Sequence, residues 1–275
     1  MLQVHSLRAA LSLVCILAFV GIADADSGTF ASQVEGLSAV ALAELPDGKA
    51  RSDDPASEHC TMPEKELLTP AGQLVATRNW LVTAEIEHAG YTFVSFVGHA
   101  ESGTSGSCYL RDGNVAVFQG TKILGVVYAN NMATRDIGLV HALEGDRLRI
   151  FDGGYPNMPL ADLQVIDDDL IIVGNVSDRD SFCGGRVSVP NIRDLEIHDA
   201  RRVLFSEGWT VDPTLSEGDD RGSGLFPHPL PETDSCMGTG LGFCSFGYVK
   251  HGSEHLRVGT VGEGYRVTDF SAWCE

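Results

Sequence analysis

The chain has few basic residues for its length. Lys and Arg number 19, against 38 Asp and Glu, and the formal net charge is -19 at pH 7. A surface of this sign repels phosphate groups, so the composition argues against nucleic acid and anionic membranes as partners. The acidity is typical of a well-solvated surface. Apolar residues make up 43% of the chain, which is enough for a packed core.

Long apolar runs are absent beyond the N-terminal segment. From Ala9 to Ile22 the chain is almost wholly apolar, with Arg8 before this run and Ala23-Asp24-Ala25 after it. This order is typical of an export signal, and the run is shorter than the roughly 20 residues that a membrane span needs. We therefore predict a signal peptide at residues 1–25 that carries Cys15 away, and a periplasmic or secreted protein without a membrane span. An uncleaved N-terminal anchor is the alternative.

The sequence also lacks a Cys-x-x-Cys pair, which zinc sites usually contain. Six cysteines follow the predicted signal, and an even number in an exported chain indicates disulfides. Cys236 and Cys244 are predicted partners because three glycines between them permit a tight reversal. Among the pairings open to the other four, we select Cys108 with Cys183 and Cys60 with Cys274.

Turn residues followed by short alternating apolar segments recur through the centre of the chain, which is the pattern of β-hairpins. The expected strands are Leu81–Ile86, Tyr91–Val97, Asn114–Phe118, Arg147–Phe151 and Leu170–Val173. We predict a β-rich antiparallel domain over residues 60–190. The segment 26–59 is rich in small and polar residues, so we expect a flexible lead-in with at most one helical turn or strand.

A helical pattern follows at residues 195–209. Ile197, Ala200, Val203 and Leu204 share one face, while Asp194 is placed to cap the start and Gly208 to end the helix. Strands are expected near Phe243–Val249, Leu256–Val261 and Tyr265–Phe270. The fold class is therefore mainly β, with a small α+β domain at 191–275 made of a helix and a disulfide-stapled meander.

The last of these domains carries a distinctive cysteine segment. Residues 236–246 read C-M-G-T-G-L-G-F-C-S-F, after a helix that ends in Ala200-Arg201-Arg202 and Gly208-Trp209. With this order, residues 192–273 resemble a C-terminal domain that recurs in uncharacterised exported bacterial proteins. The resemblance covers under a third of the chain. It implies a bacterial source, a Cys236–Cys244 bridge and a small α+β fold, but no activity or ligand.

One segment matches a catalytic signature. His251-Gly252-Ser253-Glu254-His255 reads H-x-x-E-H, the order of inverted zinc peptidases, in which both imidazoles lie on one helical face. Here Gly-Ser favours a turn, and strand-like segments flank it. We therefore predict a hairpin tip and no metal or other cofactor. His251, Glu254 and His255 remain the candidates for a zinc-dependent hydrolase.

The nucleophile motif G-x-S-x-G is absent. Ser105 lies in a Gly/Ser loop before Cys108, and it would need a partner such as His88 or His99 with a carboxylate behind it. The sequence does not show that these residues meet in space. A serine-dependent hydrolase is therefore an open alternative, and the catalytic residues stay unassigned.

The hairpins and disulfides, without a convergent set of His, acid and nucleophile, favour a protein that binds rather than catalyses. We predict a non-catalytic binding or inhibitory protein of the cell envelope. Its loops, such as Glu101–Ser107 or Ser216–Gly224, would contact another envelope protein or a wall component. An envelope hydrolase, dependent on zinc or serine, is the alternative.

Overall fold

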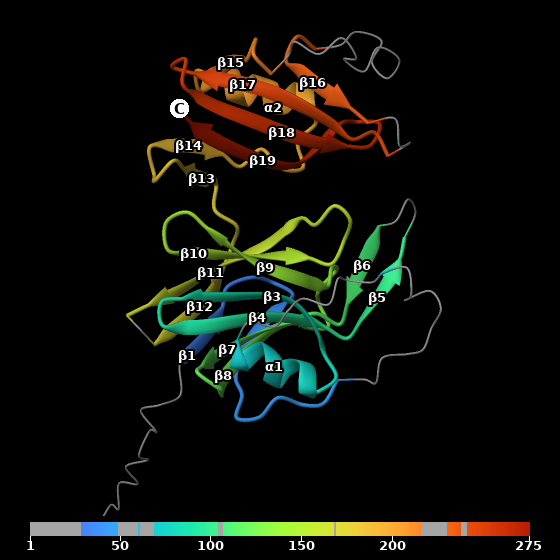
Figure 1. Ribbon diagram of the computed structural model, residues 1–275, viewed down its shortest axis with the longest axis vertical. Helices are drawn as coiled ribbons and strands as arrows, with labels where there is room; N and C mark the ends of the chain where they lie inside the picture. Colours follow the sequence, from blue (N-terminus) through green and yellow to red (C-terminus); the bar gives the residue numbers. More distant parts are fainter. Residues whose placement is uncertain are drawn as a thin grey trace, which may run out of the picture.

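The described part of the chain forms two bodies stacked along the long axis of the molecule (Figure 1). The computed structural model describes residues 29–48, 60, 69–103, 107–167, 169–215, 230–237 and 241–275. The N-terminal body comprises the described residues up to 174, and the C-terminal body those from 179 onward. The predicted signal peptide lies outside the described residues. Within them, no helix is long and apolar enough to cross a membrane.

The N-terminal body is β-rich, as the alternating segments predict, and it contains two five-stranded sheets. One has the order β1 (Thr29–Ser32), β12 (Leu170–Gly174), β11 (Pro159–Ile166), β10 (Arg147–Asp152) and β9 (Ile137–Leu143). The other has the order β2 (Leu37–Ala41), β8 (Lys122–Ala129), β7 (Asn114–Gln119), β4 (Tyr91–Val97) and β3 (Leu81–His88). Neighbouring strands are antiparallel except β1 and β12, which are parallel.

The two sheets face each other across an apolar core. Phe93, Val117, Leu148 and Leu163 are fully buried in it. At one side the sheets are also joined by hydrogen bonds, since the Thr83 hydroxyl donates to the carbonyl of Gly138 over 2.7 Å. Burial of alternate side chains on both inner faces makes the body a β-sandwich.

The outer face of the second sheet is covered by helix α1 (Pro70–Thr77). The Thr69 hydroxyl accepts a hydrogen bond from the backbone N–H of Gly72 at 3.0 Å, and Pro70 occupies the first helical position. Both are common at helix starts. A hairpin of β5 (His99–Ser102) and β6 (Cys108–Arg111) extends from this body.

The predicted flexible lead-in is wrong for residues 29–41. β1 and β2 lie in the two sheets, and Phe30 and Leu37 pack against the core. The segment is only modestly apolar, and the strands are stabilised by their partners β12 and β8 rather than by their own composition. Such long-range pairing leaves little trace in a local pattern.

The C-terminal body consists of helix α2 (Ile197–Ser206), a hairpin and a five-stranded sheet. The hairpin pairs β13 (Arg179–Phe182) with β14 (Val187–Pro190). The sheet has the order β15 (Thr210–Val211), β17 (Cys244–Lys250), β18 (Glu254–Val261) and β19 (Arg266–Cys274), and β16 (Thr233–Cys236) also pairs with β17. Fully buried Leu204, Trp209 and Phe246 belong to a core between the helix and the sheet. The mainly β fold with a small α+β unit is as predicted.

Two details of this body differ from the prediction. Val187 and Val189 belong to the C-terminal core, so the hairpin belongs with this body and the boundary precedes β13 rather than lying at residue 190. The Asp194 cap is also wrong: Glu196 is the N-cap residue and makes no side-chain cap bond. Asp194 has φ 67° and its backbone N–H donates to Val267, which ties it to β19 instead. Gly208, with φ 88°, follows the helix end as expected.

Each disulfide lies within one body. Cys236 bridges to Cys244, as the intervening glycines predict. Cys60 pairs with Cys108, and Cys183 with Cys274, so the pairings selected from the sequence for these four are wrong. β19 ends beside the β13–β14 turn, whereas β6 belongs to the other body. Sequence separation alone could not reveal which cysteines share a body.

Candidate functional site

The junction of the two bodies is built around a buried arginine. Arg149, on β10, is fully buried and donates to Asp162 on β11 at 2.6 and 3.0 Å and to Asp180 on β13 at 2.7 Å twice. Arg193 adds a third donor to Asp180 at 2.8 Å. Burial alone would raise the pKa of Asp180, but its hydrogen bonds with the two arginines outweigh burial and lower that pKa. The network therefore joins the bodies with charges that satisfy one another.

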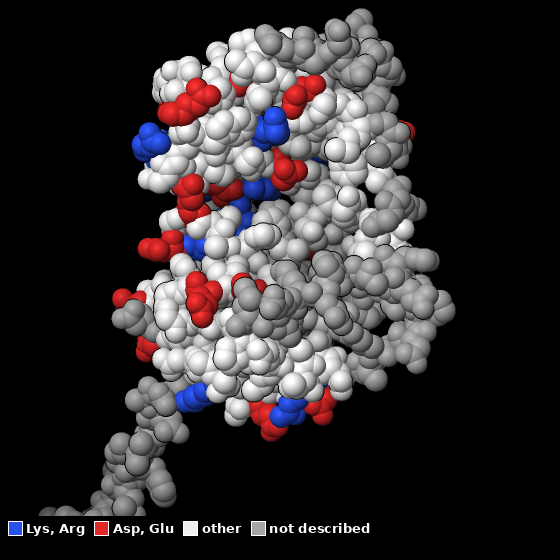
Figure 2. Space-filling model, in the orientation of Figure 1, with Lys and Arg blue, Asp and Glu red and all other residues white. Residues whose placement is uncertain are grey.

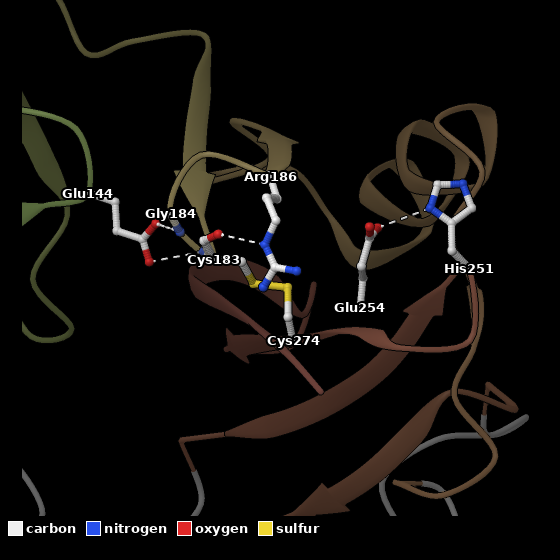
Figure 3. The surroundings of a disulfide bond; sticks show 7 residues. All are labelled: Glu144, Cys183, Gly184, Arg186, His251, Glu254 and Cys274. Carbon is white, nitrogen blue, oxygen red and sulfur yellow. Dashed lines mark hydrogen bonds and ion pairs between the residues drawn. A yellow bond between two sulfur atoms is a disulfide. The ribbon is translucent and has the colours of Figure 1, made fainter.

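A second contact lies at the turn between β13 and β14. Glu144, from the turn after β9, accepts hydrogen bonds from the backbone N–H groups of Cys183 at 3.0 Å and Gly184 at 2.7 Å (Figure 3). Cys183 is itself fixed by its disulfide to Cys274. Figure 2 shows acidic and basic side chains meeting at the waist of the molecule. Two separate contacts therefore hold one body against the other.

The junction also borders a cavity of about 320 Å³ that is open to solvent on one side. Tyr155, in the loop between β10 and β11, reaches across to Phe243, with ring centroids 6.0 Å apart in an edge-to-face arrangement. The other described lining residues come from the C-terminal body: Ser235, Met237, Leu241, Cys244, Ser245, Gly259, Thr260, Thr268 and Asp269. Ligand sites occur preferentially at such junctions.

The cavity lining separates into an apolar and a polar part. The apolar part consists of Tyr155, Met237, Leu241 and Phe243, and the polar part of four hydroxyl side chains and Asp269. The Thr268 hydroxyl donates to Asp269 Oδ1 at 3.0 Å. Gly259 leaves room for this carboxylate, because a Cβ at that position would collide with it. The arrangement suits a ligand with an apolar body and a polar end.

Two residues at the cavity are unusually exposed for their type. Met237 is 62% exposed and Tyr155 is 49% exposed, and both are among the few large apolar side chains of the described residues that face solvent. Scattered exposed apolar residues need no explanation, but their convergence on one cavity does. Met and Tyr are enriched at binding surfaces.

A second cavity, also of about 320 Å³, lies in the N-terminal body. Its described lining includes Trp80, Tyr128, Asp112 and Asp136. Both acids already have partners: Asp112 lies 3.6 Å from His99, and Asp136 lies 3.6 Å from Arg111. None of the exposed large apolar side chains lines it, so we take the junction cavity as the candidate site.

The zinc candidates do not converge. His251 and Gly252 have positive φ at the tip of the β17–β18 hairpin, so the segment is a turn as predicted. The His251 side chain is 72% exposed and lies 3.3 Å from Glu254 (Figure 3). His255 lies in β18 and is buried. Among the described residues, no group of three or more His, Cys, Asp or Glu is placed to hold a metal.

His255 instead pairs with Asp212, which follows β15. Its Nδ1 lies 2.5 Å from Asp212 Oδ2, and its ring stacks on Trp273 with centroids 5.3 Å apart. Nε2 has less than 1 Å² of exposed surface and lies 3.6 Å from Glu275 Oε1, too far for a hydrogen bond. Nε2 is the atom that would exchange a proton with a substrate, so its burial favours a structural role.

The serine candidates are only partly placed. Ser105 lies outside the described residues, and so does the segment 216–224. His88 pairs with Tyr91 at the start of β4, and His99 follows the end of that strand. β4 spans seven residues, so at about 3.3 Å per residue the two histidines are roughly 20 Å apart. Only one of these two histidines could therefore act as the general base for a given serine.

Sequence reasoning missed Tyr155 and Asp269 as site residues. Gly153-Gly154-Tyr155-Pro156 has the composition of a turn, and an aromatic residue in a turn is the one local feature that could have indicated a binding residue here. Asp269 stands in a strand without any signal.

No family model, no curated protein and no solved structure matches this chain.

Proposed function

We propose that the chain is an exported, disulfide-stabilised binding protein of the bacterial cell envelope, and that the junction cavity receives part of its ligand. The ligand would be another envelope protein or a wall component. Export is supported by the predicted signal at residues 1–25 and by three disulfides, which persist in oxidising compartments. The bacterial source rests on the resemblance of residues 192–273.

The observation that carries the proposal is the cavity between two bodies held in one orientation. The network around Arg149 and the bonds accepted by Glu144 hold the cavity walls in place before a ligand arrives. A preformed site avoids much of the entropic cost of ordering. Binding is favoured over hydrolysis because the shortest His–carboxylate contact among the described residues, Asp212 with His255, has its outer nitrogen buried.

The test is binding of the purified mature protein to envelope fractions, measured by co-sedimentation. We expect Met237→Ala combined with Tyr155→Ala to weaken binding at least tenfold, since Tyr is enriched among the residues that carry most of the energy of an interface and Met is common at adaptable binding surfaces. The protein recovered from cells should begin after Ala25, as shown by intact mass.

The matched control replaces apolar residues of similar exposure elsewhere. Met132 is 58% exposed and Ile166 is 36% exposed, and neither lines the cavity. The double variant Met132→Ala with Ile166→Ala should bind like the wild type. Equal loss in both double variants, or no loss in either, would show that the cavity is not the binding site.

A further inference from the structure

We propose that the junction cavity selects an organic cation, an amine or guanidinium group carried on an aromatic or aliphatic body. This inference rests on the proposed function, because it names the ligand class of the same cavity. It depends on three features: the charge of the cavity lining, the engagement of the nearby arginines with other acids, and the apolar wall.

The described lining of the cavity contains one charged side chain. That residue is Asp269, and no Lys or Arg lines the cavity with it. One of its oxygens, Oδ1, accepts from the Thr268 hydroxyl, which is a neutral donor. Asp269 is exposed on β19 and lies in the polar part of the lining, beside the apolar part. A carboxylate in this position, without a cation in the same lining, is complementary to a cation from the ligand.

The nearby arginines are already engaged. Arg257 lies 3.4 Å from Asp234, which also accepts from the Ser245 hydroxyl at 3.2 Å. Arg193 donates to Asp180 and stacks over Phe270 at 4.0 Å. Burial lowers the pKa of Arg193, and its interactions with Asp180 and then Asp269 only partly offset this. Asp269 thus has long-range attraction to Arg193 but no direct ion pair with it among the described residues.

The apolar wall fits the body of such a ligand. Tyr155 and Phe243 present two aromatic rings, and Met237 and Leu241 complete the wall. Aromatic rings attract cations as well as apolar groups, which adds to the effect of the carboxylate. The volume of about 320 Å³ is sufficient for a group the size of a large side chain. The net charge of -19 also raises the local concentration of cations.

The experiment compares three probes of nearly equal shape: phenethylamine, phenethyl alcohol and phenylacetate. Binding to the mature protein is followed by NMR chemical-shift changes of residues around the cavity. We expect the amine to bind about three- to tenfold more tightly than the alcohol, and the acetate to bind most weakly. Asp269→Asn should remove the preference for the amine but keep binding of the alcohol.

Asp199→Asn serves as the control, since Asp199 is an exposed acid on α2 that does not line the cavity. Equal affinity for amine and alcohol, both lost in Tyr155→Ala, would overturn the cation inference while sparing the cavity as a site. No binding of any probe would count against both. A peptide arm, acetyl-Phe-Lys-amide, identifies the source of the cation: tighter binding than phenethylamine indicates a partner's side chain, and weaker binding a free amine.

Discussion

A fully buried arginine dominates the chemistry of the junction. The Arg149 guanidinium donates hydrogen bonds to two carboxylates, Asp162 and Asp180, whose side chains are themselves almost inaccessible to solvent. Removing the cation would leave two like charges buried close together without a shared partner. Breaking a buried ion pair in this way is strongly destabilising, whereas exposed pairs contribute little.

We predict that Arg149→Met lowers the free energy of unfolding by about 3–5 kcal/mol, measured by urea denaturation. Arg202→Met is the matched control, because Arg202 pairs with Asp199 while its side chain stays 75% exposed. That change should alter stability by less than about 0.5 kcal/mol. A loss below 1 kcal/mol in Arg149→Met would mean that the network is not needed for the fold.

Single residues were predictable where the backbone forced their type. Ala89, Asp112 and Asp146 have positive φ and lie in turns. The Gly or Asp residues of these turns indicated this conformation in the sequence. The sequence did not indicate that Arg149 is buried. It lies between apolar residues in a strand, and this alternation predicts that its side chain faces solvent. Its partners Asp162 and Asp180 are 13 and 31 residues away, so only the folded chain brings them together.

Among the elements, helix α2 and the three long strands of the C-terminal sheet follow from local pattern. α1 was missed although Thr69 and Pro70 form a good helix start, because its eight residues are too few to show a clear period. β1 and β2 were missed because their stabilisation comes from distant partners. Elements with strong periodicity of their own could be predicted, and those that depend on tertiary pairing could not.

The segment after β15 is held to β18 by a carboxylate. Asp212 is 1% exposed and accepts from the backbone N–H of Thr214 at 2.8 Å and its hydroxyl at 2.6 Å, besides its bond with His255. Burial alone would raise the pKa of Asp212, but the hydrogen bonds to Thr214 and His255 outweigh it and lower the pKa. Since the folded pKa is below the unfolded value of about 3.9, the carboxylate stabilises the fold above that pH.

We predict that Asp212→Asn is less stable than the wild type by about 1.5–3 kcal/mol at pH 7, the usual contribution of charged hydrogen bonds. The difference should shrink as the pH falls below about 4 and through the folded pKa, because the wild type then loses the same charge. Urea denaturation between pH 7 and pH 3 measures this. Asp199→Asn, at an exposed acid, is the control, and a difference that grows toward low pH would contradict the assignment.

The whole molecule is two bodies joined by charges, while its disulfides lie inside each body. The cavity combines Tyr155 of one body with residues of the other that are as far apart in sequence as Ser235 and Asp269, a combination that no local pattern contains. The sequence therefore indicated disulfides and a mainly β fold, but not the junction. Within the C-terminal body, the bridges differ in the length of chain that they close.

This difference in length leads to a prediction about the two C-terminal disulfides. Cys183–Cys274 spans 91 residues and Cys236–Cys244 spans 8. Constraint of the unfolded chain grows with loop length, so the first should contribute about 4–5 kcal/mol and the second about 2–3 kcal/mol. Urea denaturation of the two double Cys→Ser variants tests the order, with intact mass confirming that the other bridges still form. An equal or larger loss from the short bridge would mean that Cys236–Cys244 acts mainly by holding the cavity wall at Met237 and Phe243, not by shortening the unfolded chain.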